Sequence, residues 1–157
     1  MNNDFNREWL TRKFEEIQRR ILKVIEQMND EQLNWRPNTA SHSVSTLIKH
    51  IEGNIKERVC NGILHGNITR NREEEFKHTY VLKKELERKV NDNFQLVIDT
   101  VHTMSDQDFK KSQLVRNRER TNLDILHQCV AHYSEHMGQI FYISKLCLKE
   151  KYISTSI

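Results

Sequence analysis

Residues 4–28 read DFNREWLTRKFEEIQRRILKVIEQM, and the spacing of their apolar positions decides the fold class. These positions recur at alternating steps of four and three, with charged residues nearly everywhere else: Leu10, Phe14, Ile17, Ile21, Val24 and Met28. This period places the apolar side chains on one stripe of an α-helix. The stretch therefore predicts a helix about 36 Å long that buries a single face.

Three more segments have a helical period, at about residues 44–60, 79–104 and 121–148. Ser41 or Ser43 can cap the first of these helices, and Thr121 can cap the last. The stretches 61–79 and 105–120 have no such period, apart from one helical turn that can open the second. Connections of this length can cross a bundle from end to end. We therefore predict an all-α four-helix bundle with long crossover connections. An open helical array or a coiled-coil dimer would not need those connections.

The composition agrees with long helices and one core. The chain has 157 residues, with only 4 glycines and 1 proline, and 30% of its residues are charged. We expect a single domain over residues 1–157. Cys60, Cys129 and Cys147 are odd in number and irregularly spaced, and no stretch resembles a signal peptide or a membrane span. We therefore expect a cytoplasmic protein with free thiols and no membrane partner.

The charge pattern argues against a dedicated nucleic-acid binder. The formal net charge is only +3, and both signs are spread along the chain. The basic run RNRER at residues 116–120 is typical of a solvated loop, since no aromatic residues interleave with it to stack bases. A nucleic-acid partner stays open as a minor alternative, which a steep salt dependence of binding would reveal.

The last predicted helix carries two histidines one turn apart, His132 and His136. At this spacing both imidazoles project from one side of the helix and can reach one metal ion. Four apolar side chains of the same helix point in the same direction, which makes the pair face the core: Ile125, Cys129, Ile140 and Ile143. An inward histidine without a partner costs about 1–3 kcal/mol. The pair therefore predicts a metal site, with a purely hydrogen-bonded pair as the alternative.

A catalytic zinc-type site takes three protein ligands and leaves one position open. His50 lies on the shoulder of the second helix's apolar face, toward the groove beside a neighbouring helix. Cys129, three residues before His132, competes as the third ligand, but a role as a small buried apolar residue explains it as well. His50, His132 and His136 form the most economical three-histidine set.

Residues 132–136 read HYSEH, which also matches the inverted zinc-protease pattern with its glutamate as general base. A helical bundle offers no extended peptide cleft, so we do not expect proteolysis. Glu135 is still a candidate catalytic base. Asn54, one turn after His50, is a candidate to orient the ligands or the substrate, and Arg58 on the same helix is a candidate to receive an anionic group of the substrate.

Two stretches carry a family resemblance: STLIKHIEGN at residues 45–54 and EHMGQI at residues 135–140. A histidine late in the second helix, together with His-x-x-x-His in the last, resembles the DinB-like (YfiT-like) superfamily over nearly the whole chain. Three further motifs are similar to a branch of that superfamily whose function is uncharacterised: WRP at 35–37, RNR at 70–72 and EF at 75–76.

The resemblance implies up-down-down-up connectivity, a zinc or nickel ion on His50, His132 and His136, and a homodimer. Some relatives are thiol S-transferases that use low-molecular-weight thiols such as bacillithiol or mycothiol, and others are linked to stress responses. The expected activity is that of a metal-dependent thiol S-transferase or hydrolase acting on a small electrophilic molecule. A non-catalytic, stress-related bundle that binds a metal or a ligand is the alternative, and no thiol-binding motif decides between them.

Overall fold

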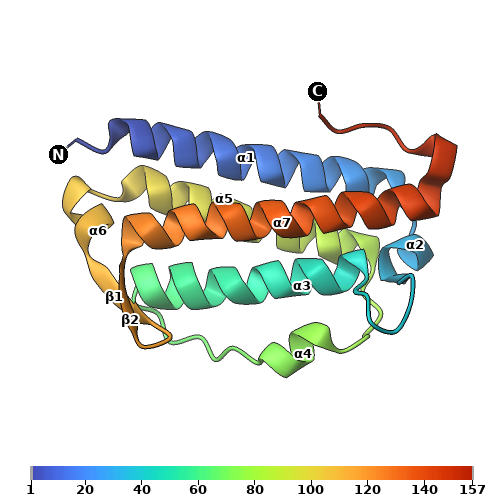
Figure 1. Cartoon of the computed structure of the whole chain (residues 1–157), viewed down its shortest axis with the longest axis horizontal. Helices are drawn as coiled ribbons and strands as arrows, with labels where there is room; N and C mark the ends of the chain where they lie inside the picture. Colours follow the sequence, from blue (N-terminus) through green and yellow to red (C-terminus); the bar gives the residue numbers. More distant parts are fainter. Residues whose placement is uncertain (1, 157) are drawn as a thin grey trace.

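Four long helices lie side by side in the computed structural model, which describes residues 2–156 (Figure 1). They are α1 (Asp4–Gln27), α3 (Val44–Ile55), α5 (Lys83–Thr103) and α7 (Asn122–Leu148). α1 and α7 run in one direction and α3 and α5 in the other, so the connectivity is up-down-down-up. The predicted all-α four-helix bundle is confirmed. Met1 and Ile157, the two ends of the predicted 1–157 domain, lie outside the described residues.

The long helices share one apolar core. α1 and α3 each pack against both α5 and α7. The apolar stripe of the first helix is buried, with no member more than 2% exposed: Leu10, Phe14, Ile17, Ile21, Val24 and Met28. Fully burying a side chain of this kind stabilises a fold by about 1.5–3 kcal/mol. Within residues 2–156, no helix combines the length and the apolar character that crossing a membrane requires.

Side-chain caps mark where the helices begin. Ser43 accepts a hydrogen bond from the Thr46 amide at the start of α3, and Thr121 accepts one from the Asp124 amide at the start of α7. Asn29 caps the short helix α2 (Asp30–Asn34), which follows α1. Such caps satisfy amides that a first helical turn leaves unpaired. Of the two predicted caps for the second helix, Ser43 is the one used.

The third long helix begins at Lys83 and not at residue 79 as predicted. The Asn34 side chain bonds both backbone groups of Val81, at 2.8 and 2.9 Å. The Asp30 carboxylate accepts from the Lys83 amide at 2.6 Å. Because α2 already supplies partners for this backbone, the residues before Lys83 stay extended.

The connection between α3 and α5 runs along the outside of α3 (Figure 1). α3 first continues as a π-helical segment, Lys56–Ile63, in which the Leu64 amide donates to the Val59 carbonyl five residues earlier. The chain then returns through the short helix α4 (Arg72–Phe76), which packs against α3. α4 was not predicted, because residues 61–79 show no helical period and were expected to form a surface connection without secondary structure.

The connection between α5 and α7 holds α6 (Asp106–Lys110) and an antiparallel hairpin of β1 (Ser112–Val115) and β2 (Arg118–Thr121). The helical turn was predicted, but the hairpin was not. Arg116 and Asn117 form its two-residue loop with φ angles of 48° and 61°. This left-handed pair fits a type I′ turn, for which Asn-Gly and not Arg-Asn is the strong sequence signal.

Candidate metal centre

α3 and α7 bring the three predicted histidines together. The Nε2 atom of His132 lies 3.3 Å from Nε2 of His50 and 2.8 Å from Nε2 of His136. One ligand atom from each of the three residues lies within 4.8 Å of the others. His50 is 6% exposed, and the other two are half-buried. Their ring nitrogens thus converge on one point at the side of the bundle.

Two of the three rings are held through their other nitrogen. Nδ1 of His50 lies 3.0 Å from Oε2 of Glu75, and Nδ1 of His136 lies 2.7 Å from Oε1 of Gln139. A carboxylate only accepts hydrogen bonds, so the proton of His50 sits on Nδ1. Oε1 of Gln139 likewise accepts a hydrogen bond from the Nδ1–H group of His136. Both rings therefore present the lone pair of Nε2 to the cluster.

Glu75 is itself fixed by a charged neighbour. It comes from α4, is 8% exposed, and receives two hydrogen bonds from Arg70, at 2.7 and 3.0 Å. Arg70 also pairs with Glu57. Gly53 on α3 leaves room for the Glu75 carboxylate, since a Cβ at residue 53 would lie 1.8 Å from Oε1 of Glu75. The carboxylate behind His50 therefore depends on a glycine, an arginine and a short helix.

The donor set fits a cation. His50 and His136 carry their protons on Nδ1, so only His132 can carry a proton on the Nε2 atom that faces the other two rings. That single N–H group cannot donate to the Nε2 lone pairs of both His50 and His136. Converging neutral imidazoles, with their outer N–H groups donated to a carboxylate or an amide, are the arrangement that metal-binding histidines adopt. The cluster of three histidines could therefore hold a metal ion.

Burial and neighbouring charges disfavour protonation of two of the histidines, His50 and His132. Burial, and then the proximity of His136 and His50, lowers the pKa of His132 to about 4. Burial also lowers the pKa of His50, and the hydrogen bond to Glu75 offsets only part of that effect. Burial alone would raise the pKa of Glu75, but the hydrogen bonds from Arg70 and His50 outweigh it and hold this pKa below its ordinary value.

Asn54 lies beside the cluster without bonding to any histidine in the described part of the chain. Its Oδ1 accepts from the buried Tyr133 hydroxyl at 2.8 Å and lies 3.9 Å from Sγ of Cys129. Those contacts turn the amide nitrogen of Asn54 away from its two neighbours. Cys129, the competing ligand in the sequence analysis, contacts Asn54 and is not part of the histidine group. Burial raises the pKa of its thiol to about 11.

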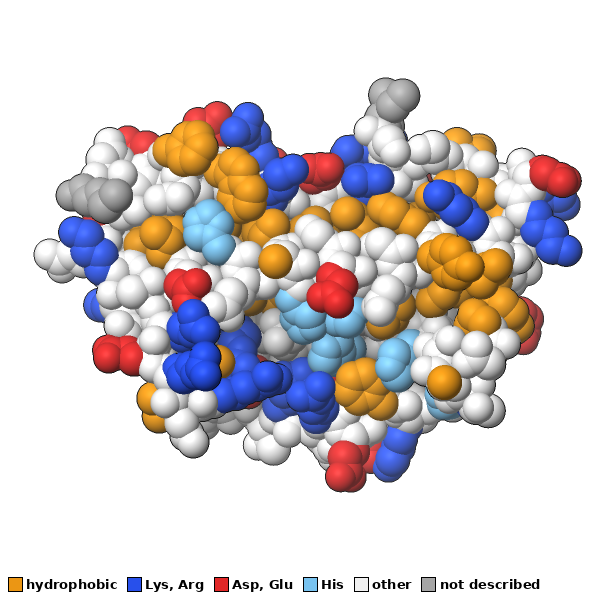
Figure 2. Space-filling view, in the orientation of Figure 1, with side chains coloured by type: hydrophobic (Ala, Val, Ile, Leu, Met, Phe, Trp, Pro, Cys, Tyr) orange, Lys and Arg blue, Asp and Glu red, His pale blue; other side chains and the backbone are white. Residues whose placement is uncertain are grey.

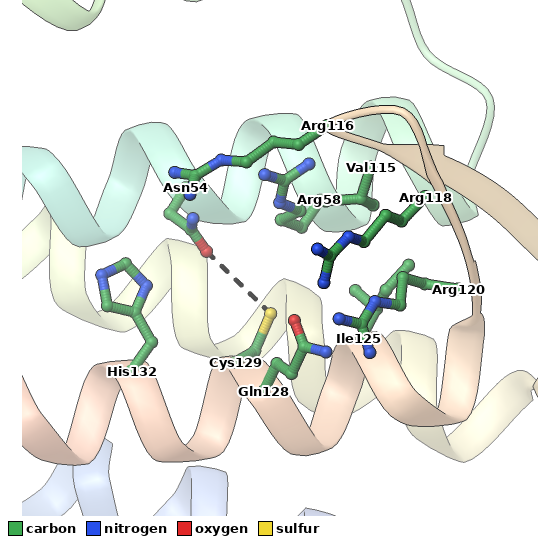
Figure 3. Close-up of a pocket in the computed structure, with 10 residues that line it drawn as sticks. All are labelled: Asn54, Arg58, Val115, Arg116, Arg118, Arg120, Ile125, Gln128, Cys129 and His132. Atoms are coloured by element: carbon green, nitrogen blue, oxygen red, sulfur yellow. Dashed lines mark hydrogen bonds between the residues drawn. The ribbon is translucent and has the colours of Figure 1, made fainter.

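A cavity of about 570 Å³ opens beside His132 (Figure 3). Asn54 and Arg58 line it from α3 and its π-helical extension, and three arginines line it from the hairpin. An adjoining cavity of about 410 Å³ shares Asn54 and Arg58 and reaches His50. Both sequence candidates on the second helix thus lie beside the histidines. In Figure 2, blue arginine and lysine side chains gather directly next to the pale-blue histidines.

Glu135 lies elsewhere. It is exposed and lines a separate, more apolar cavity of about 700 Å³, together with Gln139 and Tyr142. Among the described residues it has no hydrogen bond to any of the three histidines. The structure therefore does not bring Glu135 to the cluster, and the carboxylate that contacts a histidine is Glu75.

The motifs at residues 45–54, 70–72 and 75–76 contain Gly53, Arg70 and Glu75, but no role at this site was predicted for these three residues. A further signal was the start of a helix. Asn71 is followed three residues later by Glu74, the pattern of a helix start, and the Asn71 side chain indeed accepts from the Glu74 amide. That cap would have predicted α4. It would not have predicted that α4 lies against His50.

Comparisons with known proteins agree with the fold. The family model described as "Protein of unknown function (DUF1572)" matches residues 4–157. A conserved protein from Enterococcus faecalis is 15% identical, with a TM-score of 0.75 over 88% of this chain and 95% of that one. A DinB-like protein (YjoA) from Bacillus subtilis is also 15% identical, with a TM-score of 0.65 over 92% of this chain and 96% of that one. No curated protein matches the chain.

Proposed function

This chain belongs to the DUF1572 family of proteins of unknown function and has a fold similar to that of a DinB-like protein, and on that premise we propose that it is a metal-dependent enzyme. In this proposal His50, His132 and His136 hold one divalent ion, zinc or nickel. The observation that carries it is the convergence of three Nε2 atoms with the Nδ1 atoms of His50 and His136 already engaged. Such an ion, when bound, supplies Lewis-acid chemistry to a water or thiol nucleophile.

The surrounding residues have defined tasks. Glu75 keeps a proton on Nδ1 of His50, so that Nε2 of the same ring stays available as a ligand atom. Arg70 keeps the Glu75 carboxylate charged and in place. Asn54 lines both cavities, and Tyr133 holds its carbonyl oxygen, so its amide N–H groups can donate to a substrate.

The cavity beside His50 and His132 supports catalysis over a purely structural ion, because a catalytic site keeps a position open to substrate. We assign the activity to a thiol S-transferase or hydrolase that acts on a small electrophilic molecule, with a low-molecular-weight thiol as the co-substrate of the transferase. Glu135 is retained as a candidate base for substrates that reach the apolar cavity. A homodimer formed by single-domain chains in the cytoplasm belongs to the same proposal.

The test of the metal site is metal analysis of protein purified without chelator. We expect about one divalent ion per wild-type chain and loss of the ion from His50→Ala and His136→Ala. His102→Ala is the matched control, because His102 is exposed on α5 and lies outside the cluster. A wild-type protein without a divalent ion, or equal metal content in all the variants, would contradict the proposed metal site.

A second assay addresses catalysis. Wild type and His136→Ala are compared for the addition of low-molecular-weight thiols to a panel of electrophiles, with and without metal. Metal-dependent turnover that His136→Ala abolishes supports the enzyme. A wild type that holds the ion stoichiometrically and shows no turnover across the panel favours the non-catalytic binding bundle.

A further inference from the structure

The cavity beside His132 has an unbalanced charge. Four arginines line it, Arg58, Arg116, Arg118 and Arg120, and no aspartate or glutamate among the described residues 2–156 does. Their guanidinium groups face the space between α7 and the π-helical extension of α3 (Figure 3). Nothing in the sequence analysis combined these residues, because Arg58 lies on the second helix and the others lie in a run that read as a solvated loop.

The hairpin explains why its arginines face one cavity. Arg118 pairs with Val115 across the strands, and Arg120 pairs with Gln113. Residues directly opposite each other, and residues two apart on one strand, share a face of a hairpin. Arg118 and Arg120 therefore point to the same side as Val115, which also lines the cavity.

Arg116 reaches the cavity from the turn. Its φ angle of 48° lies in the left-handed region, which residues other than glycine, asparagine and aspartate rarely adopt. The type I′ turn of the hairpin requires this conformation at both of its central residues. In Figure 3 the guanidinium of Arg116 extends over the cavity toward Asn54.

Few of these cations have a strong partner. Arg120 pairs with Asp124 at 2.9 Å. Arg58 has a side chain only 18% exposed and approaches Glu57 no closer than 3.9 Å. Within residues 2–156, the side chains of Arg116 and Arg118 make no ion pair or hydrogen bond. Arg116 and Arg118 are exposed, and Arg58 is less accessible, so an anion in the cavity would gain charge-assisted hydrogen bonds from guanidinium groups that lack a close acidic partner.

We propose that this arginine cavity binds a dianionic group of the substrate, a phosphate or a pair of carboxylates. The inference rests on the proposed function, since His132 lines the same cavity and would place the rest of the substrate at the metal site. Guanidinium groups match such anions with paired N–H donors. The cavity volume, about 570 Å³, suits a whole small molecule and exceeds what a lone anion fills.

A nucleic-acid strand suits the cavity less well. Single-stranded binders combine basic grooves with aromatic side chains on which bases stack. No phenylalanine, tyrosine or tryptophan lines this cavity in the part of the chain that the structure describes. The positive charge of the arginines is concentrated in a cavity next to the histidines, which favours a small anionic molecule over a nucleic-acid strand as the ligand.

The test measures the dissociation constants of inorganic phosphate and succinate by calorimetry at constant ionic strength. The proteins are wild type, Arg116→Gln, Arg118→Gln and, as a matched control, Arg12→Gln, which removes an exposed arginine from α1, far from the cavity lining. Losing one charge-assisted contact is expected to weaken binding by about tenfold or more. We expect this loss in the two hairpin variants and none in the control, and the tighter of the two probes identifies the anion chemistry.

A further variant separates this inference from the metal site. His136 lines neither cavity beside the arginines, so His136→Ala removes the metal site and leaves the arginines in place. Phosphate or succinate binding that survives in His136→Ala and falls in Arg118→Gln supports the arginine cavity, whether or not the wild type holds a metal. Three results would overturn it: no binding of either probe, equal binding by Arg12→Gln and Arg118→Gln, or binding that only His136→Ala abolishes. An oligonucleotide that binds through the same arginines while both small anions fail to bind would overturn it as well.

Discussion

Nδ1 of His50 lies 3.0 Å from Oε2 of Glu75, although 25 residues separate the two along the chain. The contact joins the core of the bundle to a short helix in a connecting segment. It fixes which nitrogen of His50 faces the other two histidines.

Replacing Glu75 with glutamine should weaken metal binding by about 10–100-fold, the usual cost of losing the partner of a metal-binding histidine. Glutamine can still accept from His50, but it lacks the charge that makes the imidazole a better ligand and that pairs with Arg70. Competition with a chromogenic chelator measures the affinity. Glu73→Gln is the control, because Glu73 is exposed on the same helix. Equal affinities in the two variants would contradict the role of Glu75.

Gly53→Ala should lower metal affinity about tenfold by displacing Glu75, whose Oε1 lies 1.8 Å from the position of the new Cβ. Alanine stabilises a helix by about 1 kcal/mol relative to glycine. Helix propensity alone would therefore make Gly53→Ala more stable, whereas displacement of Glu75 is expected to weaken metal binding. Gly138→Ala is the matched control in α7, since nothing lies within 4 Å of its Cβ position. We expect Gly138→Ala to raise the free energy of unfolding in urea and to leave metal affinity unchanged. A Gly53→Ala protein with wild-type affinity would show that Glu75 can move without consequence.

Tyr133→Phe should lower the free energy of unfolding by about 1–2 kcal/mol, because it removes the hydrogen bond that the fully buried Tyr133 side chain donates to Asn54, without opening a large cavity. The Asn54 amide is then free to rotate, so binding of any ligand in the cavity should weaken too. Urea denaturation measures the first effect. Tyr142→Phe, at a residue that is 66% exposed, serves as the comparison and should change stability little. Similar losses in both variants would count against the buried bond.

The thiol of Cys129 should make stability depend on pH in the alkaline range. Burial raises its pKa to about 11 from an ordinary value of 9.0. The folded state therefore keeps the thiol proton that the unfolded state loses, and stability falls as pH rises from about 9 to 11. A shift of this size corresponds to about 2–3 kcal/mol. The difference in unfolding free energy between wild type and Cys129→Ala should narrow by roughly that amount over the range.

Cys147→Ala is the control for this prediction, because the Cys147 thiol is only half-buried and its pKa is raised less. A constant difference between wild type and Cys129→Ala from pH 8 to pH 11 would mean that the thiol does not titrate differently in the two states.

The histidine set and the fold were accessible from the sequence because their signals are local. Side chains three and four residues apart share a helix face, so the pair His132 and His136 and the four apolar stripes could be read directly. The prediction for His50 needed one more inference, because this residue lies at the edge of the apolar stripe of the second helix and not within it. The resemblance to a known superfamily then joined it to the other two.

Glu75 and the hairpin arginines were not accessible in this way. Their roles depend on the path of two long connections, and no repeating pattern determines where such a path runs. The sequence by itself determined a four-helix bundle with three histidines that could meet, since the periodicity of a helix fixes which side chains face the core. Only the tertiary structure decided which carboxylate holds His50 and which arginines share a cavity with His132, because those contacts join residues from separate elements and form only once the chain has packed.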